Sequence, residues 1–314
     1  MEGKTGKLIS VVIPAYNEED SIDELAQRLQ KVFDENKDYE FEVIIVENGC
    51  LDSTYEKLLK IHSEDQRFKV LQLSRNFRMD GGITAGLNHA SGDAAVLMAA
   101  DLQDPPELIS QFINKWEEGY ENIYGIVTKR GGTNIIRRMN SQLFYLLANR
   151  LTGGIIPRNV SDYRLIDRKV YQAINKMEER NRFVRGLFAW AGFKSTGIEF
   201  ERPPRFAGKS NADTLKVLEL ALKGIFAHSY IPLSFITIIG IAVSVLSFLF
   251  LISVVIRAFV WGVPFPGFGT IMSVLLLLFG FLFIVLGIIG QYIGLIYEEV
   301  KQRPNYIVKE KVGL

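Results

Sequence analysis

Two long apolar segments near the C-terminus constrain this chain more than any other feature of its sequence. Residues 231–260 and 268–296 are each long enough to cross a hydrocarbon core of about 30 Å, which takes about 20 helical residues. Arg257 is the only lysine or arginine between residues 231 and 300. Because residues 273–290 are apolar on every face, a buried hairpin in a soluble protein is the less favoured alternative. The sequence therefore predicts two transmembrane helices.

The charges beside these segments predict their orientation. The connecting loop, residues 261–270, carries no charge, whereas basic residues flank the pair on both sides: Lys216, Lys223, Lys301, Arg303, Lys309 and Lys311. Basic flanks favour the cytoplasmic side of a membrane, and the N-terminus has no apolar signal region. We therefore expect both ends of the chain and the domain before the hairpin to be cytoplasmic.

Composition excludes several classes of function. The net charge of +1, without a basic stripe, argues against nucleic-acid binding. Cys50 is the only cysteine, so the chain has no disulfide framework and no thiolate metal cluster. His62, His89 and His228 are too far apart in sequence to suggest a metal site.

Short apolar runs alternate with helical patterns in the part that precedes the hairpin. We expect strands at residues 8–14, 41–47, 68–73, 94–98 and near 122–128, and helices at 20–33, 52–62, 82–90 and near 106–118 and 133–151. This alternation predicts an α/β fold with a mostly parallel sheet and right-handed crossovers.

Four parts of the chain follow from these patterns. We expect a cytosolic domain over residues 1–212, an amphipathic juxtamembrane helix over 213–230, two transmembrane helices within 231–297 and a cytosolic tail over 298–314. The amphipathic stretch places its leucines on one side, which is typical of a helix at a membrane interface. A core helix packed against the sheet is the alternative.

Polar residues collect where the predicted strands end. In open α/β sheets, ligands bind beyond the carboxyl ends of the strands. Those ends read Pro14-Ala15-Tyr16-Asn17-Glu18, Glu47-Asn48-Gly49, Ser74-Arg75-Asn76 and Asp101-Leu102-Gln103-Asp104. Neither G-x-G-x-x-G nor G-x-x-x-x-G-K-[ST] occurs at the first strand–helix junction, so a dinucleotide dehydrogenase or a P-loop phosphotransferase is not supported.

An ordered set of motifs resembles a known family. Residues 11–19, 46–53 and 100–107 resemble the family 2 glycosyltransferases, which have the Rossmann-like A-type fold. Residues 74–77, 161–165, 182–187 and 205–208 resemble its polyisoprenyl-phosphate branch, which includes the bactoprenol glucosyltransferases. The resemblance covers almost the whole chain, and the two C-terminal spans agree with it.

The resemblance implies inverting transfer of a single sugar from a UDP-sugar to undecaprenyl phosphate, for modification of cell-surface glycans. Glucose from UDP-glucose is the expected donor. The protein is then a multi-pass homo-oligomer of the bacterial inner membrane whose catalytic domain faces the cytoplasm. A transferase that uses GDP-mannose or a UDP-aminoarabinose type of donor, or a catalytically weak binding or scaffold protein, remains an alternative. A processive synthase is disfavoured because the Gln-x-x-Arg-Trp motif is absent.

The resemblance also implies the site residues. Those expected to bind the nucleotide sugar are Pro14, Tyr16, Asn17, Glu18, Glu47, Asn48, Arg75, Asp101, Gln103, Arg205 and Lys209. Those expected to act in catalysis are Asp162, Asp101, Arg182 and Arg185. Asp101 is the expected ligand of Mg²⁺ or Mn²⁺, which would neutralise the leaving diphosphate. The alternative for Asp101 and Asp104 is that they cap the helix that begins near Pro105 and Pro106.

Two positions depart from the family pattern. Ala99 replaces the first carboxylate of Asp-x-Asp, and Asn48 stands where Asp-Asp-Gly has its second aspartate. Asn48 is still expected to reach a uracil edge, although its donors and acceptors differ from those of aspartate.

The acceptor side carries two arginines. A phosphate acceptor is already nucleophilic, so positioning and charge compensation should matter more than a strong base at Asp162, the family's base position. Arg182 and Arg185 are three residues apart, so on a helix they would share a face and hold a phosphate. A solvated, salt-bridged face is the alternative.

Overall fold

The computed structural model describes residues 6–130, 160–180, 182–204, 206 and 267–314, together with residues 238–240, 242–243, 245–246, 248–250, 252–253, 256 and 259–260. The chain divides into two compact units. One comprises Met1–Val217 and Gln302–Leu314, and the other comprises Leu218–Lys301.

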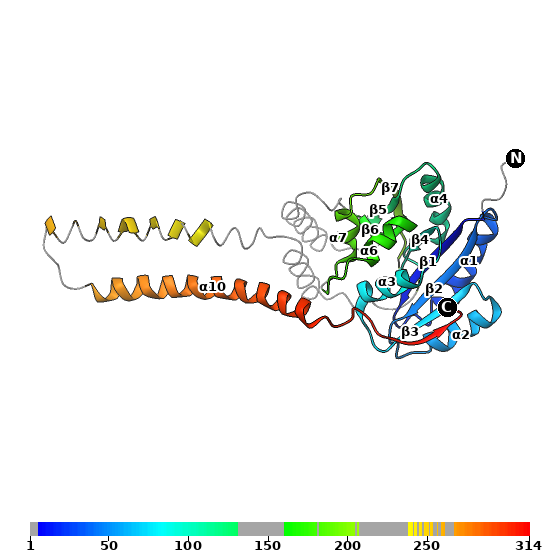
Figure 1. Ribbon diagram of the computed structural model, residues 1–314, viewed down its shortest axis with the longest axis horizontal. Helices are drawn as coiled ribbons and strands as arrows, with labels where there is room; N and C mark the ends of the chain where they lie inside the picture. The colour runs from blue at the N-terminus through cyan, green and yellow to red at the C-terminus, as the bar shows by residue number, and fades with distance from the viewer. Residues whose placement is uncertain are drawn as a thin grey trace. The chain divides into compact units, whose positions relative to one another are not determined.

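The first unit is built on an eight-stranded sheet with the order β7-β5-β6-β4-β1-β2-β3-β8 (Figure 1). The strands are β1 Leu8–Ala15, β2 Glu40–Glu47, β3 Phe68–Leu73, β4 Ala94–Leu97, β5 Asn122–Arg130, β6 Val160–Asp167, β7 Ser195–Arg202 and β8 Val308–Val312. β4, β1, β2 and β3 pair in parallel, whereas β6 and β8 run antiparallel to their neighbours. This mixed, mostly parallel sheet confirms the predicted α/β fold.

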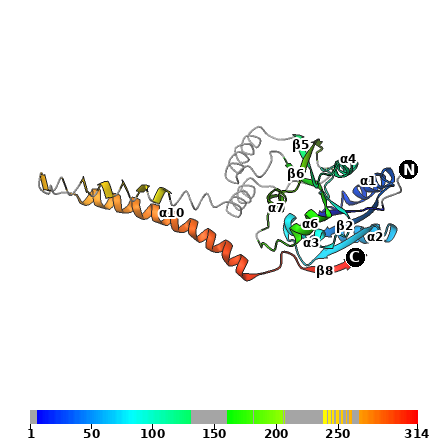
Figure 2. The same cartoon turned by 45° about the horizontal axis from the view of Figure 1, so that its top comes forward.

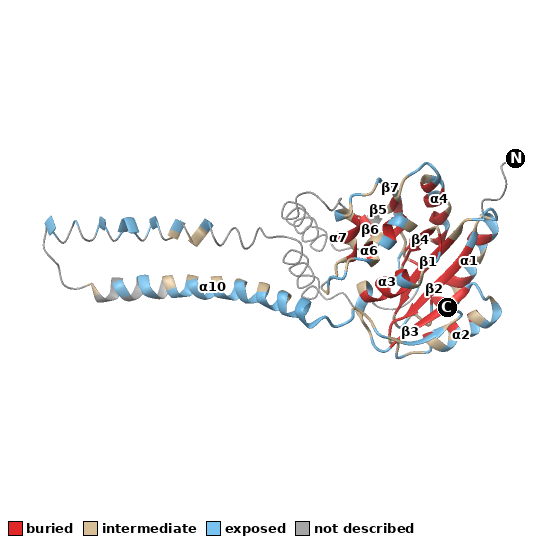
Figure 3. Ribbon diagram, viewed as in Figure 1, coloured by how far each residue is buried: buried red, intermediate tan, exposed pale blue. Residues whose placement is uncertain are grey.

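Helices cover both faces of the sheet, so the central strands are buried throughout (Figures 2 and 3). α1 (Ile22–Glu35), α2 (Thr54–Glu64) and α4 (Ile109–Glu117), with the 3₁₀ turn η1 (Pro106–Leu108), pack against one face. α3 (Arg78–His89), α6 (Arg168–Asn175) and α7 (Val184–Trp190) pack against the other. Alternation along β1 sends Val11 to the first group and Val12 to the second.

A left-handed residue follows each of the four central strands. Asn17, Gly49, Arg78 and Leu102 have φ angles of 55°, 70°, 64° and 57°. Such angles are uncommon for residues other than glycine and turn the chain sharply. The loops after β1, β2, β3 and β4 are therefore all shaped at the same edge of the sheet.

The residues after the apolar region return to the first unit, which the sequence did not predict. Gln302–Leu314, which lie within the cytosolic tail expected over residues 298–314, group with the sheet. β8 pairs with the outer edge of β3 from Val70↔Val312 to Leu73↔Val308.

The second unit contains the apolar helix α10, Phe268–Lys301. Its segment Leu278–Lys301 is long and apolar enough to cross a membrane, and none of it is buried. The described residues between 238 and 260 are helical and mostly exposed. Among the residues described, this gives one candidate spanning helix, so the predicted two-helix hairpin is not confirmed. The expected helices at 133–151 and 213–230 lie outside the described residues.

Gly86 tests the close packing of α3 on the sheet. A Cβ at this position would overlap Val12 Cγ1 of β1. We expect Gly86→Ala to lower the free energy of unfolding by about 1–3 kcal/mol through overpacking. Chemical denaturation of the detergent-solubilised protein measures it. Val12→Ala should remove the overlap, so the double variant Gly86→Ala/Val12→Ala should lose less than the sum of the two single variants. Additive losses would contradict this packing.

Candidate active site

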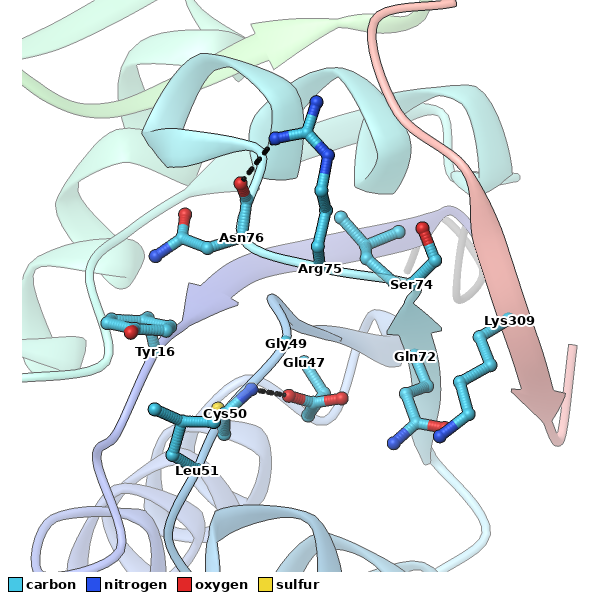
Figure 4. A pocket seen from close by; sticks show the side chains of 11 residues that line it. Tyr16, Glu47, Gly49, Cys50, Leu51, Gln72, Ser74, Arg75, Asn76 and Lys309 are labelled. Atoms are coloured by element: carbon cyan, nitrogen blue, oxygen red, sulfur yellow. Dashed lines mark hydrogen bonds between the residues drawn. The ribbon is translucent and has the colours of Figure 1, made fainter.

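A cavity of about 400 Å³ opens where β1, β2 and β3 end (Figure 4). Its lining residues are Tyr16, Glu47, Gly49, Cys50, Leu51, Gln72, Leu73, Ser74, Arg75, Asn76 and Lys309. Three of the residues predicted to bind the nucleotide sugar are among them, namely Tyr16, Glu47 and Arg75. The carboxyl ends of parallel strands therefore form a ligand-sized cavity, as expected for this class of sheet.

Gly49 lets two loops meet to form this cavity. Its φ is +70°, and a Cβ would lie 2.5 Å from the carbonyl carbon of Arg75 and 2.7 Å from the backbone nitrogen of Asn76. Backbone atoms cannot move aside as the end of a flexible side chain can. Only glycine therefore fits where the loop after β2 crosses the loop after β3.

Glu47 and Gln72 present unpaired acceptors. The backbone N–H of Cys50 donates to Glu47 Oε1, whereas Glu47 Oε2 and Gln72 Oε1 are buried without a hydrogen-bond partner within the protein. A buried acceptor without a donor is costly, so a ligand that brings N–H groups is favoured here. Burial raises the pKa of the Cys50 thiol to about 12, which makes it a poor nucleophile.

Asn48 has a different role from the one expected. Its Oδ1 accepts from Phe77 N–H at 2.9 Å, and its Nδ2 donates to the Arg78 carbonyl at 2.9 Å. Both functions of the amide thus hold the loop after β3, and Asn48 does not line the cavity. An aspartate has no donor for the Arg78 carbonyl, which gives the departure from the family pattern a physical reason.

Three other predicted residues lie at the end of β1 or in the loop that follows it. Asn17 Oδ1 accepts from Leu51 N–H at 2.9 Å, and Glu18 N–H donates to Thr54 Oγ1 at 3.0 Å. Pro14 is buried and packs beside α3. These contacts tie the loop after β1 to the loop after β2, and none of the three predicted residues lines the cavity.

Three carboxylates gather at the end of β4. β6 runs antiparallel to β4, with Leu97 opposite Arg164, so Asp162 near the start of β6 lies at the same edge as Asp101. Asp101 is only 5% exposed, and its Oδ1 accepts from Gln103 N–H at 3.2 Å. The intervening residue, Leu102, is the buried left-handed residue described above. Strained backbone of this kind is common at functional sites.

Asp104 stabilises the loop that follows β4 from the protein interior. It is 1% exposed, and its carboxylate accepts hydrogen bonds from Ala99 N–H at 3.1 Å and from Arg202 Nη2 at 3.2 Å. Burial raises the pKa of Asp104 to about 6, although Arg202 works in the opposite direction. Its oxygens are engaged by the protein itself, and no side-chain cap of η1 or α4 is formed.

Asp162 and Arg185 form a bidentate ion pair. Arg185 Nε and Nη2 lie 2.8 and 2.5 Å from the two oxygens of Asp162. Burial raises the pKa of Asp162, but the charge and hydrogen bonds of Arg185 together with the charges of Arg164 and Arg202 outweigh burial, so the pKa is lowered. Asp162 is thus a weak base.

Arg182 does not share a helix face with Arg185, which corrects the sequence-based expectation. α7 begins at Val184, so Arg182 precedes it. Arg182 Nη2 donates to the Ile174 carbonyl at 2.8 Å, and its Nε is buried without a partner. The half-buried Asp80, whose pKa is raised to about 6 by desolvation, interacts electrostatically with both arginines, which lower that pKa.

The expected metal ligand is a single carboxylate, that of Asp101. No group of three or more His, Cys, Asp or Glu side chains suited to a metal occurs within the described part of the chain. Mg²⁺, however, is commonly held by one or two carboxylates together with substrate phosphates, and the buried Asp101 at a strand end fits that mode. The Gln103 amide donates to the Pro203 carbonyl at 3.3 Å. Arg205 and Lys209 lie outside the described residues.

The structure adds Gln72 and Lys309 to the candidate site. Gln72 is the penultimate residue of a predicted strand, and strand ends are where ligand-binding side chains are expected. The position of Gln72 near a strand end could therefore have identified it from the sequence. No pattern in the sequence indicated Lys309, because this residue reaches the cavity only through the pairing of β8 with the sheet.

Comparisons with known proteins show which family this chain belongs to. The model of glycosyl transferase family 2 matches residues 10–174. An uncharacterized glycosyltransferase of Synechocystis sp. is 40% identical over 98% of this chain and 96% of its own length. A prophage-derived bactoprenol glucosyl transferase of Shigella flexneri is 36% identical over 96% and 97%. The solved glucosyl-3-phosphoglycerate synthase of Mycobacterium tuberculosis is 17% identical, with a TM-score of 0.49, over 71% and 79%.

Asn48→Asp tests the loop brace. The variant puts a carboxylate oxygen against the Arg78 carbonyl, so we expect the free energy of unfolding to fall by about 1–3 kcal/mol near neutral pH. A protonated carboxyl can donate to that carbonyl, so the folded-state pKa of the new aspartate is raised. The deficit should therefore grow as pH rises through that pKa and shrink at acid pH. Asn114→Asp, the same change on the exposed face of α4, is the control in denaturation at several pH values. A pH-independent deficit would contradict this role.

Proposed function

The chain belongs to glycosyl transferase family 2, and from this premise we propose that it transfers one glucose from UDP-glucose to undecaprenyl phosphate, with inversion, at the cytoplasmic face of a bacterial inner membrane. The observation that carries the proposal is the 36% identity with a bactoprenol glucosyl transferase along nearly the full length of both chains. That match includes the apolar helix as well as the sheet, so both a soluble donor and a lipid acceptor are in keeping with it.

The donor would occupy the cavity at the ends of β1–β3. Its base would lie near Tyr16 and supply N–H groups to Glu47 Oε2, which has no partner in the protein. Arg75 is exposed at the rim, where its guanidinium can reach a phosphate. Pro14, Asn17, Glu18 and Asn48 would support the donor indirectly by fixing the loops.

Asp101 would hold Mg²⁺ or Mn²⁺ together with the donor diphosphate, and the cation would neutralise the charge that develops on the leaving group. Asp104 would keep Asp101 in place by fixing the loop around Ala99. Gln103, whose amide is bound to Pro203, would position the same loop. Ala99 leaves the site with a single metal carboxylate from this motif.

The acceptor would approach Arg185. In the step we propose, a phosphate oxygen of the lipid forms a bond to the anomeric carbon while the bond to the diphosphate breaks and UDP leaves. Asp162 would orient the Arg185 guanidinium through the bidentate pair, and the low pKa of Asp162 suits this role better than that of a general base. Arg182 would add positive charge near the same helix.

The membrane arrangement is part of the proposal. α10 would be one of two spanning helices, and residues 231–260 would form the other. Basic residues on both sides of the pair favour a cytoplasmic catalytic domain. The proposal also includes a homo-oligomer and a juxtamembrane helix at 213–230. Arg205 and Lys209 would contribute to diphosphate binding.

Asp101→Ala tests the metal role. We expect turnover in transfer of radiolabelled glucose to organic-extractable lipid to fall at least ~10²-fold, because a few kcal/mol of leaving-group stabilisation is lost. Excess EDTA should silence the wild type. The control is Asp34→Ala, the same truncation on the exposed face of α1. Full activity in EDTA would exclude the metal, and no transfer from any of a panel of nucleotide sugars would exclude the proposed function.

Arg185→Ala tests the acceptor site. Loss of a charge-assisted contact to phosphate typically removes ~1.5–3 kcal/mol, so kcat/KM for the acceptor should fall by about one to two decades. Affinity for UDP-glucose, measured by calorimetry, should stay near that of the wild type. Lys169→Ala, which removes an exposed ion pair with Glu121, is the control. Collapse of donor binding with an unchanged acceptor KM would assign Arg185 to the diphosphate instead.

A further inference from the structure

The segment that follows α10 is fastened to the sheet of the first unit at several points. Ser74 N–H donates to the Ile307 carbonyl at 2.9 Å, and Asn88 Nδ2 donates to Tyr306 Oη at 3.0 Å. Tyr55 Oη donates to Glu310 Oε2 at 3.0 Å, and burial together with this hydrogen bond raises the pKa of Tyr55 to about 12. β8 is therefore anchored to β3, α2 and α3 by side chains as well as by its ladder.

A bulge directs one residue of β8 toward the donor cavity. Gln72 is opposite Glu310 and Leu73 is opposite Val308, so Lys309 is the extra residue between them. Bulges of this kind redirect a side chain and are common beside active sites. Lys309 is the one residue of β8 that lines the cavity. Glu47 of β2 and Gln72 of β3 line the same cavity (Figure 4).

The cavity thus combines an ammonium group with two unpaired acceptors. Glu47 is 1% exposed and Gln72 is 9% exposed, and one oxygen of each has no partner within the protein. An ammonium group offers three donors and no acceptor. The complementary ligand edge carries an N–H group beside a carbonyl oxygen, which is the edge of uracil and of guanine and not that of adenine or cytosine.

We propose that Lys309 is a specificity-determining residue for the donor base. Its ammonium group donates to O4 of uracil, while Glu47 Oε2 accepts from the adjacent N3–H. This inference rests on the proposed function, because it assigns a partner to the base of the same UDP-sugar. Donor recognition then depends on a strand that follows the apolar helix in sequence, not only on the motifs of the first hundred residues.

Binding of UDP to the full-length protein in detergent, measured by calorimetry, tests the role of Lys309. We expect Lys309→Ala to weaken UDP binding about 10- to 100-fold, as for loss of a charge-assisted hydrogen bond. Lys309→Arg should recover part of the affinity. The matched control is Lys311→Ala, an exposed lysine of the same strand that lies outside the cavity lining. Melting temperatures of the four proteins separate loss of the contact from loss of β8.

A change in the ligand locates the contact. In 4-thio-UDP a sulfur replaces O4 and accepts hydrogen bonds poorly, so the wild type and Lys311→Ala should bind it more weakly than UDP. Lys309→Ala should bind both ligands equally. An unaltered preference for UDP in Lys309→Ala would place the ammonium group on the diphosphate and overturn the proposal. Unchanged UDP affinity in Lys309→Ala would overturn it as well. A wild type that does not bind UDP would instead overturn the proposed function.

Discussion

In the parallel pairing of β4, β1, β2 and β3, all four strands end at one edge of the sheet, and every part of the candidate site depends on this alignment. Burial on both faces holds the strands in register, because a slip of one residue would exchange the apolar contacts of the two faces. The left-handed residues then turn each loop where it leaves the sheet. At Gly49 the absence of a Cβ also lets the loop after β2 touch the backbone of the loop after β3.

Local patterns in the sequence predicted this framework. The apolar runs and strand-end motifs identified β1 to β5 and placed Tyr16, Glu47 and Asp101 at the functional edge. They missed β8, because Val-Lys-Glu-Lys-Val is short and charged, and its pairing depends on contacts with Tyr55 and Ser74 far away in the chain. The role of Asn48 was missed for a similar reason. Its partner is a carbonyl thirty residues later, in a loop whose shape no periodicity reveals.

The three carboxylates at the end of β4 differ in their ion-pair partners. Asp104 is committed to Arg202, and Asp162 is committed to Arg185. A carboxylate that is already paired offers little to an incoming cation. The proposed roles follow this division, with the cation at Asp101 and the acceptor phosphate at Arg185.

The docking of β8 on β3 also fixes the order in which the molecule is completed during synthesis. Chains emerge from the ribosome N-terminal part first. β3 is therefore made early, while its partner strand is made only after α10. Until then the outer edge of β3 presents unpaired backbone groups, which tend to pair with other chains. The nascent domain therefore carries this edge open until β8, the segment that covers it, is synthesised last.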